Sequence, residues 1–306
     1  TPLANLYRQD LSSKPLSVMG LEFPNRVGLA AGLDKNGEAI DAFYDMGFGH
    51  VEIGTVTPRA QPGNPKPRIF RIPEKKAIIN RMGFNNQGIE RVLCNLSKKK
   101  TEGIVGINIG KNRNTPLEKS TEDYLFCLDQ VYPFASYVTV NISSPNTPEL
   151  RSLQFGSFLS ELLSRLKERQ DELANRYDRY VPLVIKIAPD LNISEIKSIS
   201  EAVLEINLDG IIATNTTVDH SPVVDFKHSK EEGGLSGAPL FESSIKVISA
   251  LYKLLGNKIP IIGVGGIMTA EDAEKIFSSG AKLIQIYSGF IYHGPNLIKR
   301  INSLDD

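Results

Sequence analysis

The chain has 306 residues, of which 41% are apolar, and its 35 basic residues balance its 35 acidic residues. This length suits one large domain, such as a barrel of about 250 residues with additional loops. A formal net charge of zero gives no general attraction for nucleic acid, so we expect no nucleic-acid partner. Cys94 and Cys127 lack metal-ligand spacing, which argues against a disulfide framework and a metal site. No run of about eighteen apolar residues occurs, so no membrane-spanning helix is predicted.

Short apolar runs rich in β-branched residues alternate with helix-like segments, a pattern typical of a parallel α/β fold. After a small hairpin at 18–23, strands are predicted at residues 27–31, 50–56, 104–109, 137–142, 183–187, 210–214, 259–264 and 283–287. Helices are predicted at residues 37–46, 88–99, 122–131, 155–177, 194–205, 243–255, 270–279 and 296–301. Ser194 and Thr269 are the expected N-terminal caps of two of them. Eight strand–helix units with nearly continuous apolar strands predict a closed (β/α)8 TIM barrel.

Two connections, residues 57–86 and 217–240, are too long for ordinary loops between a strand and a helix. Both follow the carboxyl end of a predicted strand, which is the end of a barrel where active sites lie. We therefore expect both connections to cover a site.

Nearly every predicted strand ends in small or amide residues, so polar groups would converge on one pocket at this end of the barrel. At any single position, turn formation alone also explains a Gly or an Asn. The glycine-rich run 263–266 and the run 287–289 lie where many barrels bind phosphate, with a plain tight turn as the alternative. A phosphate-bearing ligand is therefore predicted.

Three lysines, Lys35, Lys111 and Lys186, follow or end predicted strands. Alternation along its strand points Lys186 into the barrel, where a buried ammonium needs an anionic partner, unless it reaches the rim. The polar run 141–147 is either a capped turn or part of a site. No histidine accompanies it and no carboxylate pair ends a strand, which argues against a Ser-His-Asp hydrolase and a glycosidase.

Several segments in chain order resemble the motifs of the class 2, quinone-dependent, dihydroorotate dehydrogenase family. They are GLAAGLDK (28–35), GFG (47–49) with EIGTVTP (52–58), NRMGFN (80–85), NISSPNT (141–147), KIAPD (186–190), TNTT (214–217), GGLSG (233–237) and GVGG (263–266). The resemblance runs from about residue 18 to the end of the chain, and the number and order of the motifs make it specific. It implies an oxidoreductase that oxidises (S)-dihydroorotate to orotate in de novo pyrimidine biosynthesis.

The resemblance also implies that FMN lies at the C-terminal face of the barrel. The residues expected to contact FMN are Ala30, Ala31, Gly32, Thr55, Asn108, Asn141, Lys186, Thr214, Ser236, Gly237, Gly265, Gly266, Tyr287 and Ser288. The residues expected to bind the substrate carboxylate and ring amides are Lys35, Asn80, Asn141, Asn146, Asn215 and Thr216.

In the mechanism that the resemblance implies, Ser144 removes a proton from C5 of dihydroorotate while C6 passes a hydride to the flavin. Besides Lys35, the catalytic residues would include Thr147, which assists Ser144 by hydrogen bonding, and Phe84, which shields the site. No iron–sulfur ligand cluster is present in the sequence, so a quinone is the expected electron acceptor.

Class 2 relatives resemble one another in a helical N-terminal extension that contacts the membrane and forms the quinone tunnel. We expect residues 1–17 to be a remnant of it, too short for two full helices, and residues 18–306 to be the FMN-binding catalytic barrel. The expected location is peripheral, on the cytoplasmic side of the inner membrane in a bacterium or on the inner mitochondrial membrane in a eukaryote.

Two other functions remain open on the residues alone. The first is a lyase or isomerase on a phosphate-binding barrel, with a Schiff base at Lys186, which would purify colourless. The second is a flavin-binding protein without catalysis, against which the presence of Lys35, Ser144 and Asn146 argues. Bleaching of the flavin by substrate would distinguish this inactive protein from the dehydrogenase.

Overall fold

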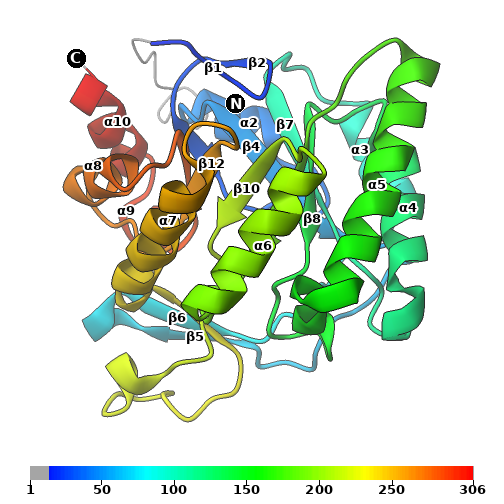
Figure 1. The fold of residues 1–306 in the computed structure, drawn as a ribbon. Coiled ribbons are helices and arrows are strands. Elements are labelled where there is room, and N and C mark those ends of the chain that lie inside the picture. The colour runs from blue at the N-terminus through cyan, green and yellow to red at the C-terminus, as the bar shows by residue number, and fades with distance from the viewer. Residues whose placement is uncertain (1–13, 306) are drawn as a thin grey trace.

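The computed structural model describes residues 14–305. Eight parallel strands close into a barrel in the order β10-β12-β13-β3-β4-β7-β8-β9, with helices around the outside (Figure 1). The predicted TIM barrel is therefore confirmed. Its strands are β3 (Val27–Leu29), β4 (His50–Val56), β7 (Ile104–Ile109), β8 (Tyr137–Asn141), β9 (Leu183–Ile187), β10 (Gly210–Ala213), β12 (Ile261–Val264) and β13 (Leu283–Ile286). The expected remnant of an N-terminal extension falls almost entirely on residues outside the described ones.

The helices surround the barrel in chain order (Figure 1). They are α2 (Ile40–Asp45), α3 (Ile89–Leu96), α4 (Ser120–Val131), α5 (Gly156–Tyr177), α6 (Ile193–Glu205), α7 (Phe241–Leu255), α8 (Ala270–Ser278), α9 (Ser288–His293) and α10 (Asn296–Asn302). Thr269 caps α8 as predicted. The cap predicted at Ser194 is wrong, because Asn192 has the extended backbone of a cap and accepts a hydrogen bond from the Glu195 amide. The short helix α9 was not predicted.

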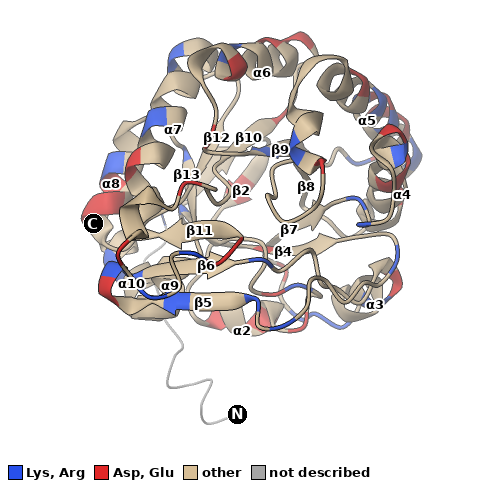
Figure 2. Cartoon of the chain, turned by 90° about the horizontal axis from the view of Figure 1, so that it is seen from below, with Lys and Arg blue, Asp and Glu red and all other residues tan. Residues whose placement is uncertain are grey.

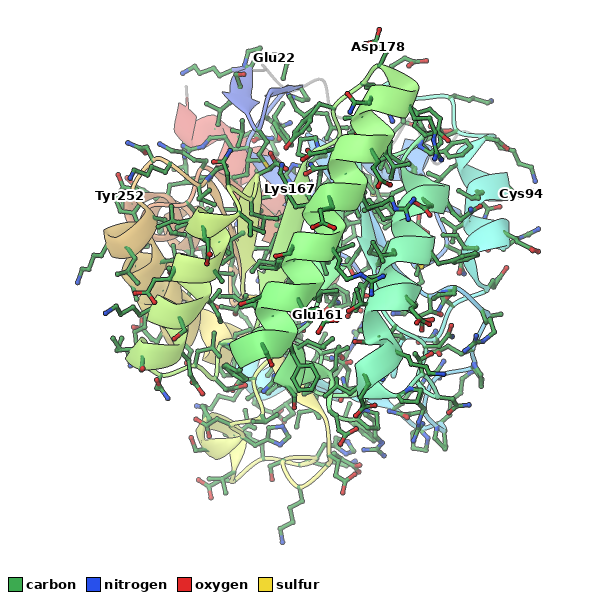
Figure 3. The ribbon with its side chains drawn as sticks, turned by 45° about the vertical axis from the view of Figure 1, so that its right-hand side comes forward. Glu22, Cys94, Glu161, Lys167, Asp178 and Tyr252 are labelled. Atoms are coloured by element: carbon green, nitrogen blue, oxygen red, sulfur yellow. The ribbon has the colours of Figure 1, made fainter. Side chains whose placement is uncertain are left out.

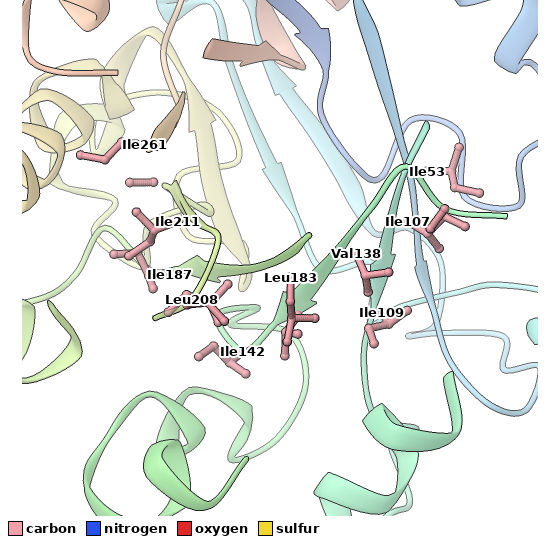
Figure 4. Packing of buried hydrophobic residues seen from close by; sticks show 14 of the residues in the cluster. Ile53, Ile107, Ile109, Val138, Ile142, Leu183, Ile187, Leu208, Ile211 and Ile261 are labelled. Carbon is pink, nitrogen blue, oxygen red and sulfur yellow. The ribbon is translucent and has the colours of Figure 1, made fainter. Parts of the chain in front are cut away.

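Alternation along the strands divides the core into two parts. Outward side chains such as Ile53, Ile107, Val138 and Ile211 pack between the barrel and the helices (Figure 4). Full burial of each stabilises the fold by about 1.5–3 kcal/mol. The outer helix faces carry basic and acidic residues close to one another (Figure 2), and Figure 3 shows Glu161 on the outer side of α5. The helices thus cover the barrel but contribute few groups to its interior.

A hairpin closes the amino-terminal end of the barrel. Strands β1 (Leu16–Val18) and β2 (Leu21–Phe23) pair antiparallel, and the hairpin begins two residues before the predicted position. Phe23 is fully buried against inward residues including Val184 and Ile212. This end of the barrel is therefore filled, which leaves the carboxyl end for a ligand.

The two long connections form a three-stranded antiparallel sheet, which was not predicted. Strands β5 (Ile69–Ile72) and β6 (Ala77–Asn80) belong to the first connection, and β11 (Gly234–Gly237) belongs to the second. The sheet crosses the carboxyl end of the barrel in Figure 2, where both connections were expected to cover a site.

Candidate active site

A pocket with about 940 Å³ of empty space opens at the carboxyl ends of the barrel strands, beside β6 and β11. This volume includes open solvent at the mouth of the pocket. Most residues expected from the sequence line it: Ala30, Ala31, Gly32, Lys35, Thr55, Asn80, Phe84, Asn141, Ser144, Asn146, Lys186, Thr214, Asn215, Thr216, Ser236, Gly237, Gly265, Gly266, Tyr287 and Ser288. Segments far apart in the sequence thus meet in one place.

Asn108 and Thr147 were also expected in the site but do not line the pocket; both are buried beside it. Lys111 lies elsewhere too, and its ammonium donates to the Thr115 carbonyl at 2.9 Å. Lining residues that sequence reasoning missed are Met82, Gly83, Leu240, Ile267, Gln285 and Ile286, whereas Val264 and Gly289 belong to the two runs expected to bind phosphate. The position of Gln285 could have been predicted from the sequence, because alternation along β13 places its side chain inside the barrel.

Asn141, at the end of β8, is the centre of the amide cluster in the pocket wall. Its Nδ2 donates to Thr55 Oγ1 at 3.0 Å and to Asn108 Oδ1 at 3.2 Å. Its Oδ1 accepts from Asn215 Nδ2 at 3.4 Å, and Asn215 also donates to Ser143 Oγ at 3.0 Å. These bonds fix the amides in one orientation, so the pocket presents a preorganised set of donors and acceptors.

A buried carboxylate supports this cluster from below. Glu52 is fully buried in the barrel and accepts hydrogen bonds from Gln285 at 2.7 Å, Asn108 at 2.8 Å, Tyr137 at 3.0 Å and Thr139 at 3.1 Å. Four donors compensate for the cost of burying the charge. Asn108 therefore connects the floor of the pocket to the amide cluster above it.

Lys186 points into the barrel, as alternation along β9 predicted, and it is almost fully buried at the pocket. Burial lowers the pKa of its ammonium, and the negative charge of Glu52 acts in the opposite direction. The barrel interior thus holds a cation at the pocket floor, and an anionic ligand above it would be a second electrostatic partner.

Ser144 lies in the loop after β8, is 6% exposed and lines the pocket. The backbone amide of Asn146 donates to Ser144 Oγ at 3.3 Å. The Asn146 side chain donates to the Asn80 carbonyl at 3.1 Å, which joins this loop to β6. The serine oxygen is therefore held in a water-poor environment with one donor aimed at it.

Phe84 covers the pocket from the first long connection and has a positive φ of 52°. Two side chains hold this backbone, since the Phe84 carbonyl accepts from Gln61 Nε2 at 3.1 Å and from Asn86 Nδ2 at 2.8 Å. Within the described residues, no hydrogen bond joins the side chains of Thr147 and Ser144. The expected assistance by Thr147 stays a prediction.

Two glycines form a cradle opposite the amide cluster. Gly265 and Gly266 have φ values of 126° and 78°, and a Cβ on Gly266 would lie 2.5 Å from the Phe241 backbone. Only glycine fits there without displacing the start of α7. Ser236 and Ser288, whose hydroxyls are 2.8 Å apart, complete the wall. Small residues and hydroxyls at this position suit a phosphate group.

Lys35 and Thr216 offer unused polar groups to the pocket. Burial, together with the positive charge of Arg68, lowers the pKa of Lys35 to about 8, so an anionic ligand would stabilise its ammonium. Thr216 Oγ1 is buried and has no hydrogen-bond partner among residues 14–305. Both groups would be satisfied by a ligand that carries a carboxylate and polar ring atoms.

Between residues 14 and 305, no group of His, Cys, Asp and Glu is arranged to hold a metal ion. In the same part of the chain, no helix has both the length and the apolar character needed to cross a membrane.

Comparisons with known proteins identify the family of the chain. The family model described as dihydroorotate dehydrogenase matches residues 15–304. A dihydroorotate dehydrogenase (quinone) of Shewanella denitrificans is 58% identical over 301 residues, which are 98% of this chain and 89% of the relative. The enzyme of the same name from Aliivibrio fischeri is 58% identical over 98% of this chain and 90% of its own. The crystal structure of DHODH in complex with ferulenol from Eimeria tenella superimposes with a TM-score of 0.91, at 38% identity over 98% of this chain and 87% of that chain.

Proposed function

Since the chain belongs to the dihydroorotate dehydrogenase family, we propose that it oxidises (S)-dihydroorotate to orotate with FMN and a quinone as successive electron acceptors. This reaction is a step of de novo pyrimidine biosynthesis. The observation that carries the proposal is the convergence of Lys35, Ser144, the amide cluster and the glycine cradle on one pocket.

The pocket residues fit FMN. The cradle of Gly265 and Gly266, with Gly237, Ser236 and Ser288, offers backbone amides and hydroxyls for the phosphate. Lys186 and Tyr287, which line the pocket at the strand ends, would hold the ring system. The other residues proposed to hold it are Ala30, Ala31, Gly32, Thr55, Asn108, Asn141 and Thr214. When bound, FMN supplies the acceptor for the hydride that leaves C6 of the substrate.

The substrate carries one carboxylate and a cyclic ring with amide donors and acceptors. Lys35 is the proposed partner of the carboxylate, because it lines the pocket and because burial and Arg68 lower the pKa of its ammonium. Thr216 would use its unpartnered hydroxyl on the ring. The proposed amide partners, each able to donate and to accept, are Asn80, Asn141, Asn146 and Asn215.

Ser144 is the proposed base that removes the C5 proton. A serine hydroxyl is a weak base, so its own proton must leave as its oxygen takes the C5 proton. The Asn146 amide, which donates to that oxygen, would stabilise the negative charge of the deprotonated serine. Phe84 would keep bulk water from the reacting carbon, and Thr147 would assist through a hydrogen bond formed when substrate is present. Each of these roles belongs to a residue in or beside the pocket.

The visible spectrum of the protein before and after anaerobic addition of dihydroorotate tests the proposal. The parent protein should be yellow and should bleach, whereas Ser144→Ala should bleach about 10²–10⁴-fold more slowly because general base catalysis is lost. Both proteins should still bind orotate. A colourless protein would favour the lyase or isomerase, and a flavin that does not bleach would favour the inactive flavin-binding protein.

Peripheral membrane contact is the remaining part of the proposal. It would use the N-terminal segment, most of which precedes the described residues, to bring the reduced site near membrane quinone. Sedimentation with phospholipid vesicles and reduction of a short-chain ubiquinone test it. Quinone turnover with no vesicle binding would remove the membrane role but leave the chemistry.

A further inference from the structure

One guanidinium joins three loops at the carboxyl end of the barrel. Arg151 lies in a short 3₁₀ helix (Leu150–Gln154) that follows the loop of Ser144. Its Nε donates to the Ser143 carbonyl at 3.1 Å and its Nη2 donates to the Thr216 carbonyl at 2.8 Å. Its Nη1 forms an ion pair with Asp190 at 2.7 Å. Arg151 thus connects the loops that follow β8, β9 and β10.

Asp190 extends the connection toward the second long excursion. Its carboxylate accepts from the Thr217 hydroxyl and from the Val218 amide, the latter at 3.2 Å. Both side chains of the ion pair are only 23% exposed, so water weakens it less than a fully exposed pair. The pair therefore holds the backbone that follows β8 and β10, the two strands that flank β9 in the barrel.

The two carbonyls that Arg151 contacts lie next to groups with proposed roles in the reaction. The Ser143 carbonyl belongs to the peptide group that leads into Ser144. The Thr216 carbonyl belongs to the residue whose hydroxyl has no partner among the described residues. One group is the proposed base and the other is a proposed substrate ligand. Because one planar guanidinium holds both carbonyls, it would fix the distance between the proposed base and the substrate.

Arginine suits this role better than lysine. The guanidinium is planar and carries five donors in a fixed fork, so three acceptors in different directions can be met at once. A lysine ammonium would keep the charge for Asp190 but would act as a single point at the end of a flexible chain. The geometry therefore depends on shape as well as on charge.

We propose that Arg151, together with Asp190, is a positioning residue that sets the geometry between Ser144 and Thr216. This inference rests on the proposed function, because it assigns the clamp to the dihydroorotate half-reaction. Loss of the clamp should misplace the base relative to C5, and a misplacement of about 1 Å can cost about 10²-fold in rate.

The test compares Arg151→Gln, Arg151→Lys and Asp190→Asn with the parent protein, all in the flavin-loaded form. Anaerobic stopped-flow gives the rate of flavin bleaching at saturating dihydroorotate, and calorimetric titration gives the affinity for orotate. Arg151→Gln should lower the rate of flavin bleaching about 10²-fold and the affinity for orotate about tenfold. Arg151→Lys should not restore the rate. Asp190→Asn leaves both carbonyl contacts of Arg151 in place. It should therefore lower the affinity for orotate by a larger factor than it lowers the rate of flavin bleaching.

Arg169→Gln is the matched control. Arg169 also pairs with two carboxylates, Glu172 at 3.2 Å and Asp129 at 3.6 Å, but it lies on the outer helix α5. Its variant should match the parent in rate and affinity. Equal rates for Arg151→Gln and the parent, or full rescue by Arg151→Lys, would overturn the proposal.

Hydrogen–deuterium exchange gives a readout that needs no turnover. In Arg151→Gln, amides in peptides that cover the loops after β8 and β10 should exchange faster, while those of β5 and β6 should not change. A parent protein that does not bleach would refute the proposed function. Faster exchange would then still show the clamp, whereas unchanged exchange in both loops would refute the clamp by itself.

Discussion

Replacing Glu52 by glutamine tests whether the buried carboxylate at the pocket floor stabilises the fold. The new side chain would have nearly the shape of the parent one, but it would offer one acceptor oxygen where the carboxylate has two. Donors approach both oxygens, from Asn108 on one side and from Gln285, Tyr137 and Thr139 on the other. Either orientation of the new amide therefore places its NH2 group against a buried donor.

The expected loss follows from these contacts. One unsatisfied buried donor costs about 1–3 kcal/mol, and removal of one partner from a buried charge pair costs about 3–5 kcal/mol. Loss of Glu52 would lower the pKa of Lys186 further, because burial already lowers it and Glu52 acts in the opposite direction, and this reduces the second cost. We expect Glu52→Gln to lower the free energy of unfolding by about 3–5 kcal/mol in total.

Urea unfolding followed by circular dichroism, at fixed protein and flavin concentrations, measures this loss. Lys186→Met provides the partner for a double-mutant cycle. Because Glu52 and Lys186 attract each other electrostatically, each single variant loses this attraction, and the double variant should lose less stability than the sum of the two. A loss below about 1 kcal/mol for Glu52→Gln, or strict additivity in the cycle, would refute the electrostatic account.

Three further predictions concern the pocket itself. Lys35 has a pKa of about 8 and is an ammonium below that pH, so kcat/KM for dihydroorotate should fall as the pH rises through 8. Arg68→Gln should move this fall to higher pH. An unchanged pH profile would contradict the assignment of Lys35. Gly266→Ala should release FMN, measured by flavin absorbance after gel filtration, because its Cβ would lie 2.5 Å from the α7 backbone. Gly256→Ala, with φ of 57° and nothing within 4 Å, should keep FMN and lose only about 1 kcal/mol of stability. Thr216→Val removes a buried hydroxyl without a partner, so the melting temperature should not fall while orotate binds about tenfold more weakly; a lower melting temperature with parent affinity would count against a ligand role.

The barrel and most of the pocket could be predicted from the sequence because both depend on local patterns. Each strand is a short apolar run, and the residue that ends it is placed at the pocket by the geometry of parallel strands. The same alternation that placed Lys186 inside the barrel also applies to Glu52, which was recognised only as part of a motif.

The sequence could not predict the three-stranded sheet or the clamp, because both join residues that are distant along the chain. Strand β6 is four residues long and pairs with β11, which carries two glycines among its four residues. Such runs have little strand character of their own and are stabilised by their partner. Arg151 likewise follows a polar loop and shows no sign in the sequence of the three acceptors that it meets.

The pairing of β6 with β11 has a thermodynamic consequence. Asn80 pairs with Gly234 and Ile78 pairs with Ser236, whose hydroxyl also donates to the Ile78 carbonyl across 158 residues of chain. A ligand that orders the strand of Ser236 therefore orders the strand that presents Asn80 to the other side of the pocket. Coupling of this kind is reciprocal, so the factor by which the cofactor raises the affinity for orotate is the factor by which orotate raises the affinity for the cofactor. Preparations kept in orotate should retain more flavin than those kept without it.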